Sequence, residues 1–217
     1  LGYRMRAGGG DLSRIPTERY VVAGPGRQAA KSEATRDKVI RAVIALIRET
    51  GFASATSTEI AKRAGVTWGA VQHHFGGKEE ILEAVLERSH RAFQQTLANS
   101  VFTKGTPEAR VAKYVDAAWE HYRGDEYMAA MEILLAMRGH AGATQQWSVG
   151  HSRAEHLALG RRIFHDSTAN KQRLLEAIYL VHCMLTGILI ETVLEGAGFN
   201  ARVYTRHLKK QVLDVLY

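Results

Sequence analysis

The stretch TSTEIAKRAGVTWGAVQHHFGGKEEIL, residues 56–82, predicts two short helices separated by a tight turn. Thr56 and Glu59 have the spacing of a capping box, in which the hydroxyl and the carboxylate each accept a free backbone N–H. Gly65 is placed to end the first helix in the left-handed conformation, and Thr67 is placed to cap the second. A pair of glycines then ends the second helix. The spacing therefore predicts a helix-turn-helix.

The second helix, WGAVQHHF from Trp68 to Phe75, has only a narrow apolar stripe. Val71 and Phe75 lie four residues apart and share one face, which we expect to pack on the core together with Val66. The other positions are small, polar or aromatic, so their face is free to approach another molecule. A helix of this kind can enter the major groove of DNA, although any helical hairpin has the same periodicity.

Apolar residues recur at helical spacing on both sides of this pair, and the alternating runs typical of strands are scarce. Helices are predicted from near Lys31–Thr35 to Gly51, over 78–99, and near 107–123, 125–139, 145–167, 171–196 and 200–216. Glycines mark most of the breaks between them. The chain is therefore predicted to be all-α.

The chain has 217 residues and a formal net charge of +7, which favours anionic partners such as nucleic acid or a membrane surface. Residues 1–30 are rich in arginine and glycine and show no apolar period. We expect a flexible basic arm there, either a tail without a role or an arm that follows a nucleic-acid backbone. The single cysteine, Cys183, excludes an internal disulfide and suits a reducing cytosol.

Motifs typical of enzymes are missing from the sequence, which has no Walker loop, HExxH, nucleophile elbow or CxxC. Four carboxylates that could serve an enzyme are interpreted as solvated helix faces. They are Glu120, Asp125, Glu126 and Glu132. The longest apolar run, Ala177–Ile190, is shorter than the ~20 residues that cross a bilayer, and no signal peptide is evident. A small helical enzyme and a helical adaptor or membrane-surface protein are the alternatives from other classes; no cofactor is expected.

The run from about Thr35 to Ser89 resembles the N-terminal domain of the tetracycline-repressor (TetR) family of bacterial regulators. The matching positions keep a fixed spacing through both helices and into the start of the next one. They are Thr56, Ile60-Ala61, Ala64-Gly65-Val66, Gly69, His74-Phe75, Lys78-Glu79 and Leu82. The rest of the chain is similar to the family only in length and helical character.

The resemblance implies an all-α protein in which an N-terminal three-helix helix-turn-helix domain precedes a larger helical domain for ligand binding and dimerisation. We assign residues 1–30 to the arm, 31–90 to the DNA-binding domain with its helix-turn-helix at 56–75, and 91–217 to the C-terminal domain. The resemblance also implies a cytoplasmic bacterial homodimer that binds a near-palindromic operator as a repressor. A small, largely apolar ligand would release it by changing the spacing of the two recognition helices.

The resemblance further implies which residues contact DNA. They are Thr58, Thr67, Trp68, Gly69, Ala70, Gln72, His73, His74 and Lys78. His74 and Lys78 match positions that commonly touch phosphate. Gln72 departs from the family, which usually has tyrosine there, and its amide can donate to phosphate or pair with adenine. Trp68 could contact thymine methyl groups or pack on its own domain, and both interpretations stay open.

Aromatic residues and methionines of the C-terminal domain are candidates for an effector pocket, although ordinary core packing explains them equally well. The candidates are Trp119, Tyr122, Met128, Met131 and Trp147. No metal site is expected, because neighbouring helical residues such as His73 and His74 point about 100° apart. Four histidines of the C-terminal domain also lack the i, i+4 pairing of two ligands on one helix. They are His140, His151, His156 and His165.

Residues 171–196 are apolar nearly all round, so this helix needs cover on more than one side. Together with the helix near 200–216, it is expected to form half of a four-helix interface between two subunits. Complete burial within one chain is the alternative. Cys183 is expected to pack in this region as a small apolar residue.

Overall fold

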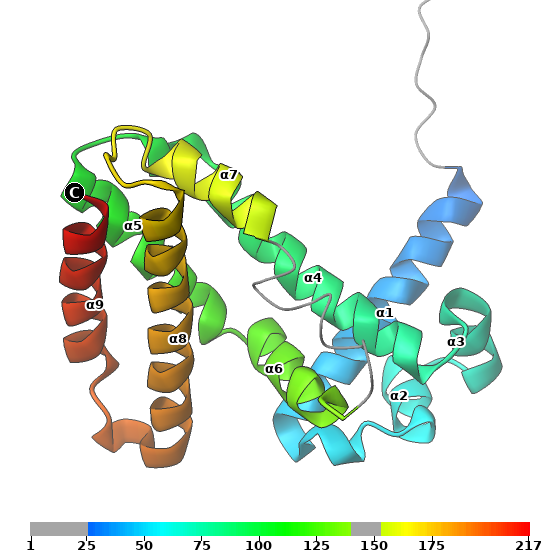
Figure 1. The fold of residues 1–217 in the computed structure, drawn as a ribbon. Coiled ribbons are helices and arrows are strands. Elements are labelled where there is room, and N and C mark those ends of the chain that lie inside the picture. The colour runs from blue at the N-terminus through cyan, green and yellow to red at the C-terminus, as the bar shows by residue number, and fades with distance from the viewer. Residues whose placement is uncertain (1–25, 140–152) are drawn as a thin grey trace, which may run out of the picture.

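The computed structural model describes residues 26–139 and 153–217, in which all regular structure is helical (Figure 1). The helices are α1 (Arg27–Thr50), α2 (Ser57–Ala64), α3 (Trp68–Phe75), α4 (Lys78–Ala98), α5 (Pro107–Tyr122), α6 (Asp125–Met137), α7 (Arg153–Ile163), α8 (Lys171–Glu195) and α9 (Ala201–Leu216), with 3-10 turns η1 (Phe52–Ser54), η2 (Ser100–Thr103) and η4 (Gly196–Gly198). The prediction of an all-α protein is confirmed. Most of the predicted arm, residues 1–25, lies outside the described residues, and α1 begins about one turn earlier than the sequence indicates.

Side-chain caps and one glycine set the ends of α2 and α3. The Thr56 hydroxyl accepts the Glu59 N–H at 3.3 Å, and the Thr67 hydroxyl accepts the Ala70 N–H at 3.1 Å. Gly65 adopts the left-handed conformation, with φ 66° and ψ 37°. Its own N–H and that of the next residue therefore bond back onto carbonyls in the last turn of α2. The turn between the two helices is fixed by the local chemistry that the sequence predicts.

Only half of the predicted capping box forms. The Thr56 N–H donates to the Ser54 carbonyl at 2.8 Å, so it does not bind the Glu59 carboxylate. That carboxylate lies 3.7 Å from the ammonium group of Lys62 instead. The expectation of a reciprocal box is wrong because the turn η1, directly before α2, already supplies an acceptor.

Two hydrophobic cores organise the molecule, and α6 lies in the first of them. The first core contains buried residues of α1 to α4 together with Ala129, Ala130, Ile133 and Met137 of α6. The second core joins α5, α7, α8 and α9. Figure 1 accordingly shows α6 beside α1, and α8 and α9 side by side at the other end. The predicted division at residue 90 assigns α6 to the C-terminal domain, whereas its buried face lies in the N-terminal core.

A tight connection turns the chain from α5 back towards the first core. Gly124 lies between the two helices, and its N–H donates to the His121 carbonyl at 3.1 Å. A Cβ atom at Gly124 would lie 3.1 Å from that same carbonyl oxygen, which is closer than nearly all real contacts. A larger residue would therefore push the start of α6 away from the end of α5. Gly124 sets the direction in which α6 leaves the second core.

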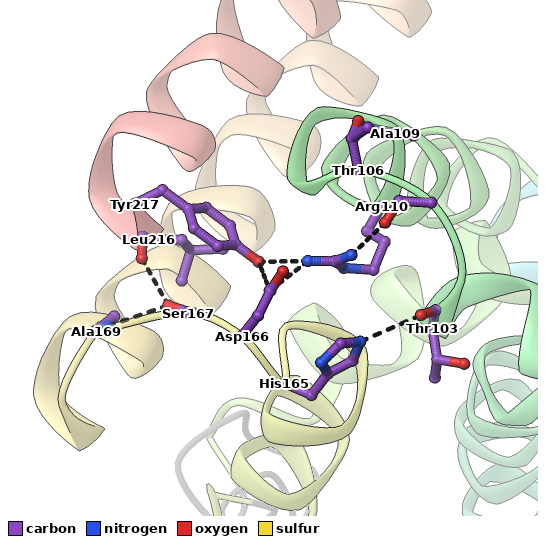
Figure 2. Close-up of polar contacts among 11 residues, drawn as sticks. Thr103, Thr106, Ala109, Arg110, His165, Asp166, Ser167, Ala169, Leu216 and Tyr217 are labelled. Carbon is purple, nitrogen blue, oxygen red and sulfur yellow. Dashed lines mark hydrogen bonds and ion pairs between the residues drawn. The ribbon is translucent and has the colours of Figure 1, made fainter.

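An ion-pair network around the buried Arg110 joins three segments of the C-terminal part (Figure 2). Arg110, near the start of α5, is only 2% exposed, and its guanidinium donates to the Gly105 carbonyl and the Asp166 carboxylate. Tyr217 accepts a hydrogen bond from Arg110 at 3.0 Å and donates one to Asp166 at 2.6 Å. The hydrogen bonds from Tyr217 and Arg110 lower the pKa of Asp166. The network ties the start of α5 and the segment after α7 to the end of α9.

Helix α8 coincides with the helix predicted near 171–196 and extends beyond the apolar run Ala177–Ile190 at both ends. The segment Lys171–Gly198 is long and apolar enough to cross a membrane by length and composition, so the prediction that it is too short is wrong. Core helices pass the same test, and the residues of α8 that are buried between Leu174 and Leu189 pack in the second core. Cys183 lies on the exposed side of the helix.

His121, near the end of α5, is a histidine whose neutral form is favoured by its surroundings. Its ring stacks on Phe93 of α4 with centroids 4.8 Å apart and meets Tyr127 of α6 edge-on at 5.4 Å. Its Nε2 lies 3.5 Å from the Ser89 hydroxyl. Burial lowers the pKa of His121 to about 4, and the attraction of Glu126 opposes this shift only in part.

We expect the protein to lose stability as the pH falls from 7 to 4.5. The unfolded chain takes up a proton at His121 near pH 6.5, its ordinary pKa, whereas the folded chain does so only near pH 4. Acid therefore favours the unfolded state throughout this window, by up to about 2.5 kcal/mol at its lower end. Urea unfolding at pH 7 and at pH 4.5 measures the loss.

The variant His121→Phe isolates this contribution, because it keeps an aromatic ring but cannot titrate. Its loss of stability between the two pH values should be smaller than that of the wild type. His207→Gln, at an exposed position of α9, is the matched control and should follow the wild type. An equal pH dependence in the wild type and in His121→Phe would show that His121 titrates normally in the folded protein.

Candidate nucleic-acid interface

Helix α3 is anchored by one face and leaves the other open. Val71 and Phe75 are buried in the first core, as their spacing predicts, and they lie there with Ile60 and Ala61 of α2. Because α3 has only eight residues, this narrow anchor leaves most of its surface uncovered. The exposed side of α3 includes Gln72, three residues before Phe75.

The nine predicted DNA-contacting residues lie on α2, α3, the turn between them and the start of α4. Five of them are exposed, and these are Thr58, Thr67, Gly69, Gln72 and His73. Four are half-buried, and these are Trp68, Ala70, His74 and Lys78. Figure 1 shows α2, α3 and the start of α4 gathered at one end of the molecule, opposite α8 and α9. The structure therefore brings the nine positions to one region, and their contact with DNA stays a prediction.

Trp68 packs partly against the first core, as does Val66. Of the two interpretations that the sequence leaves open, packing on its own domain therefore describes much of this side chain. The indole is not fully buried, so part of it remains at the surface next to the cap residue Thr67. Burying part of the ring stabilises the start of α3 and leaves only its outer portion for contact with another molecule.

His74 and Lys78 each have a partner within the protein. The Nδ1 atom of His74 lies 3.3 Å from the Ser32 hydroxyl of α1. The Lys78 ammonium lies 5.2 Å from the centroid of the Phe52 ring, in a cation–π contact. Neighbouring rings His73 and His74 meet edge-on at 5.4 Å. Within the part of the chain that the structure describes, no group of three or more His, Cys, Asp or Glu side chains is arranged to hold a metal ion.

Among the predicted effector residues, Tyr122 has the most defined surroundings. Its hydroxyl lies 2.6 Å from Nδ1 of His182 on α8, and its ring stacks on Tyr127 of α6 at 4.1 Å. Burial is the main cause that raises the pKa of Tyr122 and lowers the pKa of His182. The sequence reading missed His182, because its contact with Tyr122 depends on how α5 and α8 meet.

The other predicted effector residues are dispersed. Trp119 packs partly on the second core, while Met128 and Met131 are half-buried on α6. Trp147 lies outside the described residues. A cavity of about 360 Å³ between α4 and α7 is lined mainly by Phe93, Ala98, Ala158 and Leu159, together with Gln94, Glu155, His156 and Arg162. None of the four predicted effector residues that the structure describes lines this cavity, so their role also stays a prediction.

The interpretation of four carboxylates as solvated helix faces is wrong for Glu126 and Glu132, which are half-buried, whereas Asp125 and Glu120 are exposed. Asp125 accepts from Arg48 Nε of α1 at 2.7 Å, and Glu132 accepts the Phe52 N–H at 3.0 Å. Glu126 accepts from Arg88 Nε of α4 at 2.7 Å. The fourth carboxylate, Glu120 on α5, only pairs with Arg123 in the next turn, at 2.6 Å.

Arg88 makes a second contact that extends this set of ion pairs. Besides Glu126 on α6, its guanidinium donates to the Asp37 carboxylate of α1, which also pairs with Arg41. Three helices therefore meet at one guanidinium. Burial lowers the pKa of Arg88, but its bonds to the two carboxylates outweigh this and raise it. A cavity of about 530 Å³ with charged walls opens beside these residues, between α1, α4 and α6.

Comparison with known sequences gives a family match centred on α2 and α3. The model of bacterial regulatory proteins of the tetR family matches residues 39–85, from the middle of α1 to the first half of α4. The transcriptional regulator SrpR of Pseudomonas putida is 36% identical over 91 residues, which make up 42% of this chain and 43% of SrpR. The chain thus matches less than half of that relative's length.

A second relative is matched over a larger share of its own length, and a solved structure is similar over most of this chain. TtgW, an uncharacterized transcriptional regulator of Pseudomonas putida, is 35% identical over 91 residues, which are 42% of this chain and 68% of TtgW. A TetR-family member from Streptomyces coelicolor shares the fold with a TM-score of 0.64 at 16% identity, over 84% of this chain and 98% of that chain. The helix-turn-helix, the sequence match and the shared fold together show that the chain belongs to the TetR family of bacterial regulatory proteins.

Proposed function

We propose that this chain is a cytoplasmic, ligand-responsive transcriptional regulator, which binds a near-palindromic operator as a homodimer and acts as a repressor. The observation that carries the proposal is the exposed face of α3, which is anchored to the core only by Val71 and Phe75. An exposed helix that follows a tight turn can enter the major groove, while the preceding helix crosses the backbone. A small, largely apolar effector releases the operator.

The exposed residues of α3 suit base recognition, and those around them suit phosphate. The Gln72 amide can donate to adenine N7 and accept from its N6 amino group, and His73 lies beside it on the exposed side. His74 and the Lys78 ammonium stand at the two sides of the Gly-Gly break, where they can bind phosphate oxygens. Gly69 adds no side chain, which lets the helix backbone approach the DNA closely.

The exposed apolar residues of α8 and α9 support a dimer through this end of the molecule. Val193 is 58% exposed and Leu194 is 74% exposed, although both are large apolar residues. Ile190 on α8, with Val203 and Tyr204 on α9, extends the exposed apolar surface. A second copy that packs the same two helices against it would cover this surface in a four-helix arrangement. In this arrangement α8 faces a second subunit rather than a membrane.

Helix α6 connects the effector region to the DNA-binding helices. One face contributes Ile133 and Met137 to the first core, and its carboxylates bind α1, η1 and α4. Another face carries Tyr127, which stacks on Tyr122 and lies 3.5 Å from the Thr186 hydroxyl of α8. An effector that displaces Tyr127 would therefore shift α6, and with it the helices that hold α3. Coupling of this kind is typically 1–3 kcal/mol, or ~5–150-fold in affinity.

Selection of genomic DNA fragments with the purified protein tests DNA recognition. We expect enrichment of a near-palindromic site whose halves lie about one helical turn, ~34 Å, apart. Gln72→Ala and His73→Ala should each weaken binding to this site by about tenfold, and binding to random DNA much less, because base contacts carry sequence discrimination. Gln95→Ala, at an exposed position of α4, is the matched control and should bind as the wild type does. If no fragment is preferred over random DNA, the proposal fails.

The variant Glu126→Gln tests the connection through α6. The substitution removes the charge that pairs with Arg88 but keeps the size of the side chain. Because both side chains of the pair are about one-third exposed, the variant should lose less than about 1 kcal/mol of unfolding free energy. We expect its ligand-free affinity for the selected site to change by about threefold or more, since α1 and α4 lose one common anchor.

Glu120→Gln is the matched control for this variant, because it removes a carboxylate that pairs only within one helix turn. Fluorescence anisotropy with a labelled copy of the selected site measures the three affinities. Equal affinities for the wild type, Glu126→Gln and Glu120→Gln would exclude a role for the Glu126–Arg88 pair in setting the position of α3.

A further inference from the structure

Between Ala29 and Lys38, α1 contacts the rest of the protein through polar and charged side chains. None of the residues from Ala29 to Lys38 is buried, and the contribution of α1 to the core begins at Val39. The contacts that reach out from this part of the helix come from Ser32, Arg36 and Asp37. Two of these three side chains, Ser32 and Arg36, contact the C-terminal end of α3.

Arg36 binds the last turn of α3 in two ways. Its guanidinium donates to the His74 carbonyl, and the same group lies 4.2 Å over the Phe75 ring. Carbonyls in the last turn of a helix have no partner within that helix, and a cation at this end is favoured by the helix dipole. In a helix of only eight residues, this contact satisfies a large part of the exposed C-terminal end.

Ser32 lies one helical turn before Arg36, so both side chains project from the same face of α1. Its hydroxyl is 3.3 Å from Nδ1 of His74, the residue whose carbonyl Arg36 binds. Within residues 26–139 and 153–217, no hydrogen bond to the other ring nitrogen, Nε2, is formed. The side chain and the main chain of His74 are therefore both held from α1, while Nε2 is left available.

We propose that Ser32 and Arg36 are positioning residues of the recognition helix, and that Ser32 fixes the His74 tautomer that can bind DNA phosphate. The inference rests on the proposed function, because it assigns the DNA contact to Nε2 of His74. The Ser32 hydroxyl can donate to Nδ1 or accept from it, and in the proposed tautomer it donates. Because a neutral imidazole carries one proton, that proton then lies on Nε2. Phosphate oxygens only accept hydrogen bonds, so Nε2–H binds them whereas a bare Nε2 lone pair repels them.

Arg36 has the complementary role of fixing the position of the His74 main chain. Without its bond to the His74 carbonyl, the main chain of the last turn of α3 would be held from α1 only through the side-chain contact between Ser32 and His74, besides the buried Val71 and Phe75. Those side chains bury one face of α3, but they do not prevent its C-terminal end from fraying. Arg36 thus keeps Nε2 at a constant distance from the DNA backbone, and Ser32 keeps a proton on it.

The tautomer is tested in the free protein by long-range ¹H–¹⁵N correlation spectra of protein labelled with ¹⁵N-histidine. We expect His74 to show the Nε2–H pattern in the wild type and in Ser32→Thr, which keeps the hydroxyl. Ser32→Ala should show a mixture of tautomers at His74. Thr50→Ala, which removes a hydroxyl from the opposite end of α1, is the matched control and should leave the spectrum of His74 unchanged.

DNA binding provides the second arm of the experiment. On the selected operator, Ser32→Ala and Arg36→Ala should each weaken binding by about five- to tenfold, as expected for loss of a charge-assisted hydrogen bond. Ser32→Ala should also lower the slope of affinity against salt by about one phosphate contact. Lys38→Ala removes the same charge as Arg36→Ala from the other side of α1 and should have a smaller effect.

The two arms separate failure of this inference from failure of the proposed function. An Nδ1–H pattern at His74 in the wild type, or an identical pattern in Ser32→Ala, overturns the role of Ser32 whether or not the protein binds DNA. Equal operator affinities for Arg36→Ala and Lys38→Ala overturn the role of Arg36. If the tautomer behaves as expected but no DNA is bound, the proposed function is wrong while the contact between α1 and α3 stands.

Discussion

The packing of α6 into the core beneath the recognition helix is the constraint on which the rest of this structure depends. Ala129, Ile133 and Met137 lie in the same buried cluster as Val71 and Phe75, the two residues that anchor α3. Protein cores are close-packed and respond to strain as discrete rearrangements rather than by smooth deformation. In the proposed mechanism, a shift of α6 is therefore transmitted to α1 and α4, the helices that pack with α3. Helix α6 is therefore packed as part of the N-terminal core of α1 to α4, although it follows α5, which packs in the second core.

Polar contacts around this core fix the orientation of the helices that pack in it. Each exposed ion pair adds little free energy, but Arg48–Asp125 and Arg88–Glu126 fix the rotation of α6 relative to α1 and α4. The same logic applies at α3, where two polar side chains of α1 hold the end of a helix whose buried face is too narrow to fix it alone. At the opposite end, the buried Arg110 network fixes the C-terminal helices to one another (Figure 2). The molecule thus uses apolar burial for stability and ion pairs for orientation.

The sequence predicts those parts of the structure that depend on near neighbours. The caps at Thr56 and Thr67, the left-handed Gly65 and the buried pair on α3 all follow from spacings of a few residues, and all are present. Predictions failed where the partner lies far along the chain. Glu126 and Glu132 look solvated in the sequence because their partners, Arg88 and Phe52, are 38 and 80 residues away. Half of the capping box failed for a local reason, since the 3-10 turn before α2 was not anticipated. The candidate interface was found through family resemblance, whereas its supports at Ser32 and Arg36 carry no sequence signal.

Native-state hydrogen exchange in low concentrations of denaturant tests the central claim most directly, because it shows which helices open together. If α6 is part of the DNA-binding unit, the slowest amides of Ala129–Ile133 should share one opening free energy and one denaturant dependence with those of α1 and α4. The amides of α8 and α9 should form a separate group. The account would be contradicted if α6 exchanged together with α8 and α9 while α1 to α4 opened independently of it.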